Sequence, residues 1–159
     1  MNAMSEDDAP STQPAPIKEL ALNILVPSVY PLGLLVMWLA PMDFGFGHRP
    51  LVYAGFAIGL AGVAIWIVGM MSLGQSLAVL PGAKFLVRRG LYRFVRHPIY
   101  MGISMAFLGL VLCLGSGWGL AYLLALVLPL NFIRARLEER AMRAQFGEDY
   151  EHWRSQTWF

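Results

Sequence analysis

One basic stretch near the middle of the chain carries histidine and tyrosine side chains that could bind an anionic group. His97 is followed directly by Pro98, and Tyr92 and Tyr100 are close to it in the sequence. Proline suits the first turn of a helix and pushes the preceding residue out of the helical conformation. We therefore expect His97 just before a helix whose first N–H groups can bind an anion. A simpler interpretation is that the arginines of this stretch anchor the chain at a membrane surface and its tyrosines are interfacial aromatics.

A second polar stretch carries Arg134, Glu138 and Glu139 and has no proline or glycine before Gly147, so it predicts a helix. Arg134 and Glu138 are four residues apart and share a helix face, as do Glu139 and Arg143. An apolar stripe is also expected on this helix: Ile133, Leu137, Ala141 and Ala144. The helix could be solvated and ion-paired, or Arg134 and Glu138 could line a cavity, because they lie one turn from an apolar run.

Other kinds of site have little support. His48 and His152 lack partners at metal-ligand spacing, and Cys113 lies in an apolar run. We therefore predict no metal site and no cysteine nucleophile. With 57% hydrophobic and 14% charged residues and a net charge of +2, the chain does not have the composition of a nucleic-acid-binding protein.

The apolar residues form runs that are too long for a globular core, which predicts an all-α integral membrane protein. Residues 20–40 and 51–73 are uncharged and long enough to cross the hydrocarbon core. Three glycines of the second run have a spacing that suits close helix packing: Gly55, Gly59 and Gly62. Residues 1–18 are expected to form a disordered cytoplasmic tail, which leaves 19–159 as one domain.

The third apolar run, residues 99–133, is about twice as long as a single short crossing needs. Gly115, Ser116 and Gly117 near its middle predict a tight hairpin of two spans, 99–114 and 117–133. With four spans, every one of the 12 Lys and Arg residues except Arg49 lies on the cytoplasmic side, whereas three spans would divide them evenly. The sequence therefore predicts four transmembrane helices, cytoplasmic C-terminal helices, and both termini and any active site on the cytoplasmic face.

The two polar stretches together resemble a known pattern. Residues 86–102 read LVRRGLYRFVRHPIYMG, and a hydrophobic hairpin, Glu138-Glu139 and the FGEDY of residues 146–150 follow. This arrangement resembles the isoprenylcysteine carboxyl methyltransferase family and its phospholipid methyltransferase relatives, over about residues 74–155. The resemblance implies an integral membrane enzyme that passes a methyl group from S-adenosylmethionine to a lipophilic acceptor entering from the bilayer.

The resemblance also implies which residues form the site. Cofactor contacts would come from the loop before the hairpin and the helix after it: Lys84, Leu86, Val87, Tyr92, His97, Pro98, Ile99, Tyr100 and Glu138. Arg134 matches the family arginine that orients the reacting end of the substrate. Lys84 departs from the family pattern, because eukaryotic members have a histidine there.

A carboxylate acceptor is favoured, because it needs no base and Arg134 could bind it bidentately. An amine or thiol acceptor would have to lose a proton, for which Glu139 on the substrate side or His97 are the candidates. The alternatives are a phospholipid N-methyltransferase acting on phosphatidylethanolamine-type amines, a related membrane reductase that uses a dinucleotide, and a non-enzymatic membrane scaffold. The expected partners are a lipophilic substrate and the bilayer, without nucleic acid, and the oligomeric state stays open.

Overall fold

The computed structural model describes residues 17–39, 48–73 and 86–158, and the regular structure in these ranges is helical. This confirms the predicted all-α class. The helices follow one another along the chain as α1 (Ile17–Leu39), α2 (Arg49–Leu73), η3 (Gly90–Arg93), α3 (Pro98–Leu114), α4 (Gly117–Tyr122), η4 (Leu123–Val127), α5 (Leu128–Phe146) and α6 (Glu148–Ser155). The predicted tail lies outside the described residues except for Ile17 and Lys18, which begin α1.

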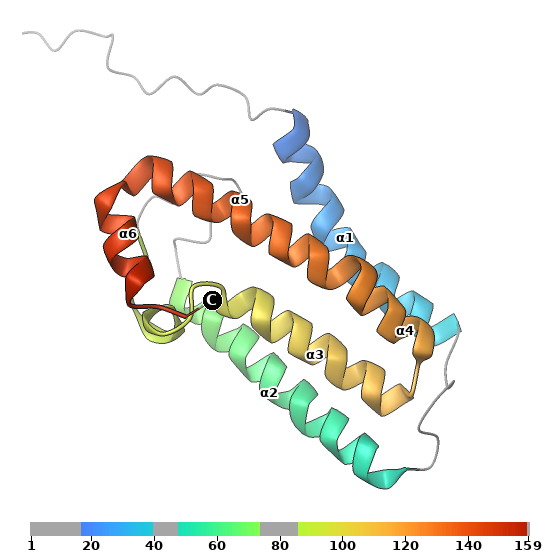
Figure 1. Cartoon of the computed structure of the whole chain (residues 1–159). Coiled ribbons are helices and arrows are strands. Elements are labelled where there is room, and N and C mark those ends of the chain that lie inside the picture. Colours follow the sequence, from blue (N-terminus) through green and yellow to red (C-terminus); the bar gives the residue numbers. More distant parts are fainter. Residues whose placement is uncertain (1–16, 40–47, 74–85, 159) are drawn as a thin grey trace, which may run out of the picture.

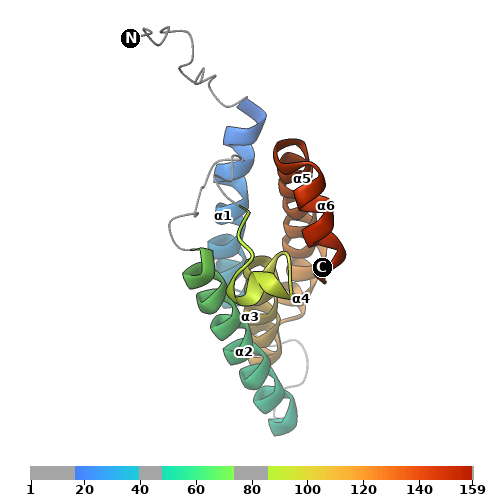
Figure 2. The ribbon, with the colours of Figure 1, turned by 90° about the vertical axis from the view of Figure 1, so that its left-hand side faces the viewer.

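The long helices alternate in direction (Figure 1). Helix α1 contacts α4 and η4, the continuous helix made of α4, η4 and α5 contacts α3, and α2 packs along the length of α3. Figure 2 shows α6 folded back beside α5, near the short helix η3. The ends of α2 and α5 and the beginning of α3 are therefore at one end of the bundle.

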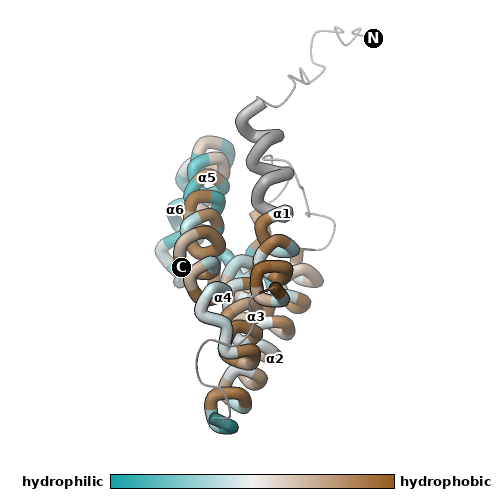
Figure 3. Tube along the Cα trace, turned by 90° about the vertical axis from the view of Figure 1, so that its right-hand side faces the viewer, coloured by the Kyte–Doolittle hydropathy of each residue, from teal (hydrophilic) through white to brown (hydrophobic). Residues whose placement is uncertain are grey.

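Two helices of the described chain are long and apolar enough to cross a membrane: α2 and the continuous helix Gly117–Phe146. Pro27–Leu39 and Pro98–Leu114 are shorter apolar helices, so the fourfold crossing stays a prediction. Hydrophobic residues dominate α2 and α3, and hydrophilic residues gather at the end of α5 and on α6 (Figure 3). Large apolar side chains such as Phe56 and Leu60 are exposed on the outside of the bundle, as is typical of lipid-facing helices.

Glycines bring α2 and α3 into close backbone contact. A Cβ atom at Gly55 would lie 2.8 Å from the Gly109 carbonyl oxygen, and one at Gly102 would lie 2.6 Å from the Trp66 nitrogen. These separations are too short for any side chain, so the glycines let the two backbones approach. The predicted packing role of Gly55 and Gly62 is confirmed, whereas a Cβ atom at Gly59 would meet nothing nearer than 3.6 Å.

Local capping explains where α3 begins and ends. Pro98 occupies its first turn directly after His97, as predicted. Gly115 ends the helix in the left-handed conformation with φ 63°, which favours glycine. Ser116 then caps α4 by accepting a hydrogen bond from the Gly119 nitrogen at 3.0 Å. The helix break predicted at residues 115–117 thus lies between α3 and α4.

Helix α5 buries two polar residues and leaves two residues of its predicted apolar stripe exposed. Ile133 and Leu137 of the predicted apolar stripe are 48% and 41% exposed, whereas Asn131 and Glu139 are buried. The solvated interpretation of this helix is therefore wrong for Glu139. Glu139 is buried because Arg96 and His97, from the loop before α3, pack against its carboxylate.

Candidate active site

Glu138 on α5 is the meeting point of three predicted site residues. The Tyr100 hydroxyl, on the first turns of α3, donates a hydrogen bond to Glu138 Oε1. Arg134 Nε lies 3.3 Å from the same oxygen, and His97 Nδ1 lies 3.9 Å from Glu138 Oε2. The structure thus brings the loop before α3 and the helix after α4 together, as the resemblance implies.

Glu139, the next residue, faces the loop on the other side of His97. Its carboxylate lies 3.1 Å from Arg96 Nε and 3.5 Å from His97 Nε2. Arg143, with which Glu139 was expected to share a face, instead pairs with Glu151 of α6 at 2.5 Å. His97 therefore lies between two adjacent carboxylates, and Arg96 holds the buried one.

Burial sets the protonation of the loop residues. It lowers the pKa of His97 below its ordinary value, although the charges of Glu138 and Glu139 oppose this effect. His97 is therefore neutral at pH 7 and serves as a hydrogen-bonding group. Burial raises the pKa of Tyr92, and the charge of Glu138 raises it further. The Tyr92 hydroxyl thus stays protonated and lies within electrostatic reach of Glu138.

An apolar cluster supports the loop from the side of α6. Tyr92, Tyr150 and Trp153 are buried together, with Leu86 and Val87 packed against them. The indole nitrogen of Trp153 donates to the Tyr92 carbonyl at 3.2 Å. This cluster packs apolar side chains against the loop and fixes the orientation of η3.

The residues after α6 fasten the same loop by backbone pairing. The Arg96 nitrogen donates to the Trp158 carbonyl at 3.0 Å, and the Trp158 nitrogen donates to the Phe94 carbonyl at 2.8 Å. The Arg96 side chain also donates to the Arg154 carbonyl at 3.3 Å. The segment that precedes His97 is therefore held by both α5 and the chain beyond α6.

Two of the predicted cofactor residues contact α2 with their side chains. Pro98 and Ile99 pack against α2, where a Cβ atom at Gly69 would lie 3.1 Å from Ile99 Cγ1. Lys84 lies outside the described residues.

Sequence reasoning missed a polar chain that continues from the cluster into the bundle. The Tyr30 hydroxyl of α1 donates to Asn131 Oδ1 at 2.5 Å, and Asn131 Nδ2 donates to the Ser104 hydroxyl at 3.1 Å. Tyr30 also lies within electrostatic reach of Arg134 and Glu138. A buried asparagine three residues before Arg134, on the same helix face, was the signal available in the sequence.

This arrangement can bind a ligand that carries hydroxyl groups and charges of both signs. The Glu138 side chain is 38% exposed, and its Oε2 keeps capacity to accept hydrogen bonds. Arg134 offers a guanidinium, His97 and Tyr92 offer neutral polar groups, and the apolar cluster offers a wall. In the described ranges, no three His, Cys, Asp or Glu side chains converge in a way that could hold a metal ion.

Comparisons with known proteins point to methyltransferases. The model of the phospholipid methyltransferase family matches residues 51–149. The protein-S-isoprenylcysteine O-methyltransferase of Schizosaccharomyces pombe is 34% identical over 94 residues, which cover 55% of this chain and 39% of that relative. The matched part is therefore well under two thirds of the relative's length. No solved structure matches the chain.

Proposed function

The chain belongs to the phospholipid methyltransferase family, and we propose that it is an integral membrane enzyme that transfers a methyl group from S-adenosylmethionine to a lipophilic acceptor. The favoured reaction is O-methylation of a carboxylate. The observation that carries this proposal is the convergence of Tyr100, Arg134 and His97 on one half-exposed carboxylate, Glu138.

The polar and apolar residues around Glu138 fit S-adenosylmethionine, which supplies a methyl group on a positively charged sulfur. Glu138 would accept hydrogen bonds from the ribose hydroxyls, and its charge favours the sulfonium nearby. Tyr92 and Tyr100 add polar edges and aromatic faces for a cation. The first N–H groups of α3 and neutral His97 would bind the carboxylate of the cofactor. Leu86 and Val87 would provide the apolar wall that excludes water.

Arg134 would orient the acceptor. A guanidinium binds a carboxylate bidentately, which aligns one oxygen for in-line displacement and needs no base. Its position one turn from the apolar part of the continuous helix suits an acceptor whose tail stays in the bilayer. The substrate named for the S. pombe relative, an S-isoprenylcysteine, is such a molecule.

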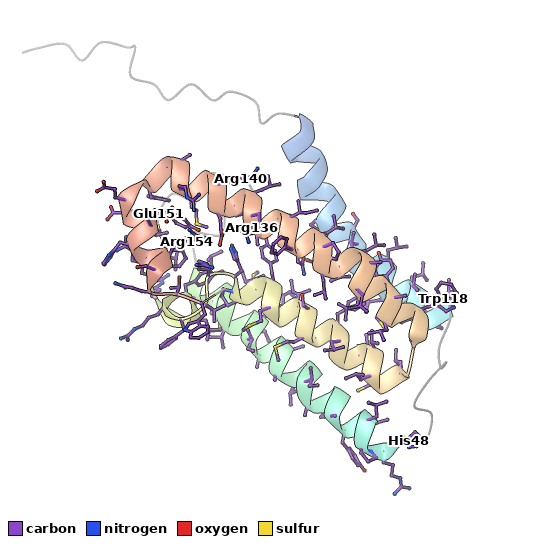
Figure 4. All side chains as sticks on the ribbon, viewed as in Figure 1. His48, Trp118, Arg136, Arg140, Glu151 and Arg154 are labelled. Carbon is purple, nitrogen blue, oxygen red and sulfur yellow. The ribbon has the colours of Figure 1, made fainter. Side chains whose placement is uncertain are left out.

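We infer further that the chain crosses the membrane four times, with α3 and α4 forming a tight hairpin and the site on the cytoplasmic side. Figure 4 places His48 and Trp118 at one end of the bundle and Glu151 and Arg154 at the other. The second end also carries Arg136 and Arg140, and it is the end rich in arginine. The positive-inside rule assigns that end to the cytoplasm.

A phospholipid amine is the second candidate acceptor. The buried Glu139 carboxylate 3.5 Å from neutral His97 favours it, because this pair could take up the proton that an amine must lose. The description of the matched family also points to phospholipids.

Product analysis separates the two reactions. Membranes that contain the protein would be incubated with methyl-labelled S-adenosylmethionine, using membranes with the Glu138→Gln variant as control. A methyl ester releases labelled methanol in base, whereas a methyl group on nitrogen is not released as methanol and is recovered in the phospholipid fraction of extracts not treated with base. If folded protein in detergent binds neither the cofactor nor its demethylated product in calorimetry, the proposal is wrong.

A further inference from the structure

The chain of hydrogen bonds from Tyr30 to Ser104 ties α1 to the site. Tyr30, Asn131 and Ser104 come from α1, α5 and α3, and Asn131 is 5% exposed. Tyr30 lies before the part of the chain that the family model matches, residues 51–149. Burying a polar group deep in an apolar bundle is costly unless the group is hydrogen-bonded or functional. The hydrogen bonds that join Tyr30, Asn131 and Ser104 therefore need an explanation.

These hydrogen bonds lie next to the expected position of the acceptor. Asn131 and Arg134 are three residues apart on one face of α5, so Asn131 is about 4.5 Å further along the helix axis. Its direction from Arg134 is away from the arginine-rich end and toward the apolar middle of the bundle. Tyr30 is hydrogen-bonded to this Asn131. An acceptor held at Arg134 with its tail in the bilayer would therefore pass Tyr30.

The hydrogen-bonding capacity of Tyr30 is only partly used. Its O–H hydrogen goes to Asn131 Oδ1, and Asn131 in turn donates to Ser104. The phenolic oxygen of Tyr30 keeps lone pairs that can accept one more hydrogen bond. Because the Tyr30 hydrogen is directed to Asn131, the Tyr30 oxygen can only accept a further hydrogen bond. It therefore selects a ligand with an N–H or O–H donor.

We propose that Tyr30, held in place by Asn131, is a specificity-determining residue for the methyl acceptor and accepts a hydrogen bond from a neutral donor beside the acceptor's carboxylate. The proposal rests on the proposed function and narrows its substrate class. The preferred acceptor is a lipophilic acid with an amide N–H or a hydroxyl next to the reacting group, and a lipophilic acid that lacks such a donor is a poorer one.

A purely structural role for Tyr30 makes a different prediction, and the chain offers a matched control. The Tyr122 hydroxyl on α4 also ties α1 to the bundle, because it donates to the Val29 carbonyl at 2.9 Å. Tyr122 stacks on Phe107 in the apolar core and not on the polar cluster. If tethering α1 were all that mattered, Tyr30→Phe and Tyr122→Phe would have the same consequences.

The test compares two acceptors in lipid nanodiscs that contain the full chain: an N-acylated S-prenylcysteine and the same molecule with the acylamino group replaced by hydrogen. The unmodified protein is expected to show about a tenfold higher kcat/KM for the amide-bearing acceptor, as one hydrogen bond allows. Tyr30→Phe should remove this preference by lowering kcat/KM for that acceptor alone. Tyr122→Phe should keep the preference, and cofactor affinity should be the same in all three proteins.

Three results would overturn the role of Tyr30 while leaving the methyltransferase intact. The first is equal use of both acids by the unmodified protein, and the second is an equal loss for both acids in Tyr30→Phe. A parallel loss of preference in Tyr122→Phe would assign the effect to tethering and would also overturn it. If the unmodified protein methylates neither acid, the preferred reaction itself fails, and labelled phospholipid amine would then identify the second candidate.

Discussion

Glu138 connects the two polar segments through different atoms of one carboxylate. One oxygen receives the Tyr100 hydroxyl and faces Arg134, and the other faces His97. The side chain is still half-exposed, so it can bind a ligand without breaking these contacts. Glu138 can thus contribute both to helix packing and to ligand binding. Its replacement should weaken ligand binding more than it destabilises the fold.

Glu138→Gln keeps the shape of the side chain and removes its charge. We expect the dissociation constant of the demethylated cofactor to rise about 10- to 100-fold, because hydrogen bonds to a charged group contribute about 1.5–3 kcal/mol. Calorimetry in detergent measures this change. Glu148→Gln, an exposed acidic residue at the start of α6, is the control and should bind normally. Equal affinity in both variants would remove Glu138 from the cofactor site.

His97 should make stability depend on pH in a defined direction. Burial lowers its pKa in the folded protein below the value of about 6.5 in the unfolded chain. The unfolded state therefore binds more protons below that pH, so this contribution is fully present above pH 6.5 and is lost as the pH falls through the lower, folded pKa. Thermal unfolding from pH 8 to pH 5 should show a steeper loss for the unmodified protein than for His97→Gln. A parallel pH profile for the two proteins would contradict the assignment.

At the residue scale, sequence reasoning succeeded where local pattern and family motif agree. His97, Tyr100, Arg134, Glu138 and Glu139 were all singled out, and the structure brings them together. Contacts across long sequence separations were not predictable. Nothing in the sequence links Tyr30 to a residue about a hundred positions later, and the partner of Glu139 proved to come from the loop instead of its own helix.

Individual helices were predicted best where a residue has a fixed conformational effect. Pro98 and Gly115 mark the two ends of α3 because one lacks an N–H and the other adopts positive φ. The orientation of α5 could not be read in the same way. Its pattern is amphipathic, but which side faces inward depends on whether lipid or water surrounds the helix.

Close packing between α2 and α3 yields a prediction at the scale of these elements. A Cβ atom at Gly62 would lie 2.7 Å from the Gly102 carbonyl oxygen, whereas one at Gly59 would meet nothing nearer than 3.6 Å. Gly62→Ala should force the helices apart and destabilise the protein by about 1–3 kcal/mol, seen as a lower unfolding temperature. Gly59→Ala should be neutral or slightly stabilising, because alanine favours a helix. Similar unfolding temperatures for the two variants would show that α2 and α3 can move apart at little cost, which would contradict the prediction.

For the whole molecule, the four-span arrangement can be tested with single cysteines. Starting from Cys113→Ala, which removes the only native cysteine, His48→Cys and His152→Cys place thiols at exposed positions at opposite ends of the bundle. In right-side-out vesicles, a membrane-impermeant maleimide should label the first variant directly and the second only after permeabilisation. Labelling of both from one side would contradict the three crossings that the four-span arrangement places between them, and with them the proposed sidedness.

The two halves of the site are carried by helices of unequal length. Tyr100 is on α3, which has 17 residues, and Glu138 is on the continuous helix of 30 residues, about 45 Å long. The apolar part of the long helix, residues 117–133, is about as long as α3, and the excess length is the charged part that begins at Arg134. Tyr100 is therefore at the start of one apolar helix and Glu138 just beyond the apolar part of the other. The hydrogen bond between them limits how far the two helices can slide past each other along their axes.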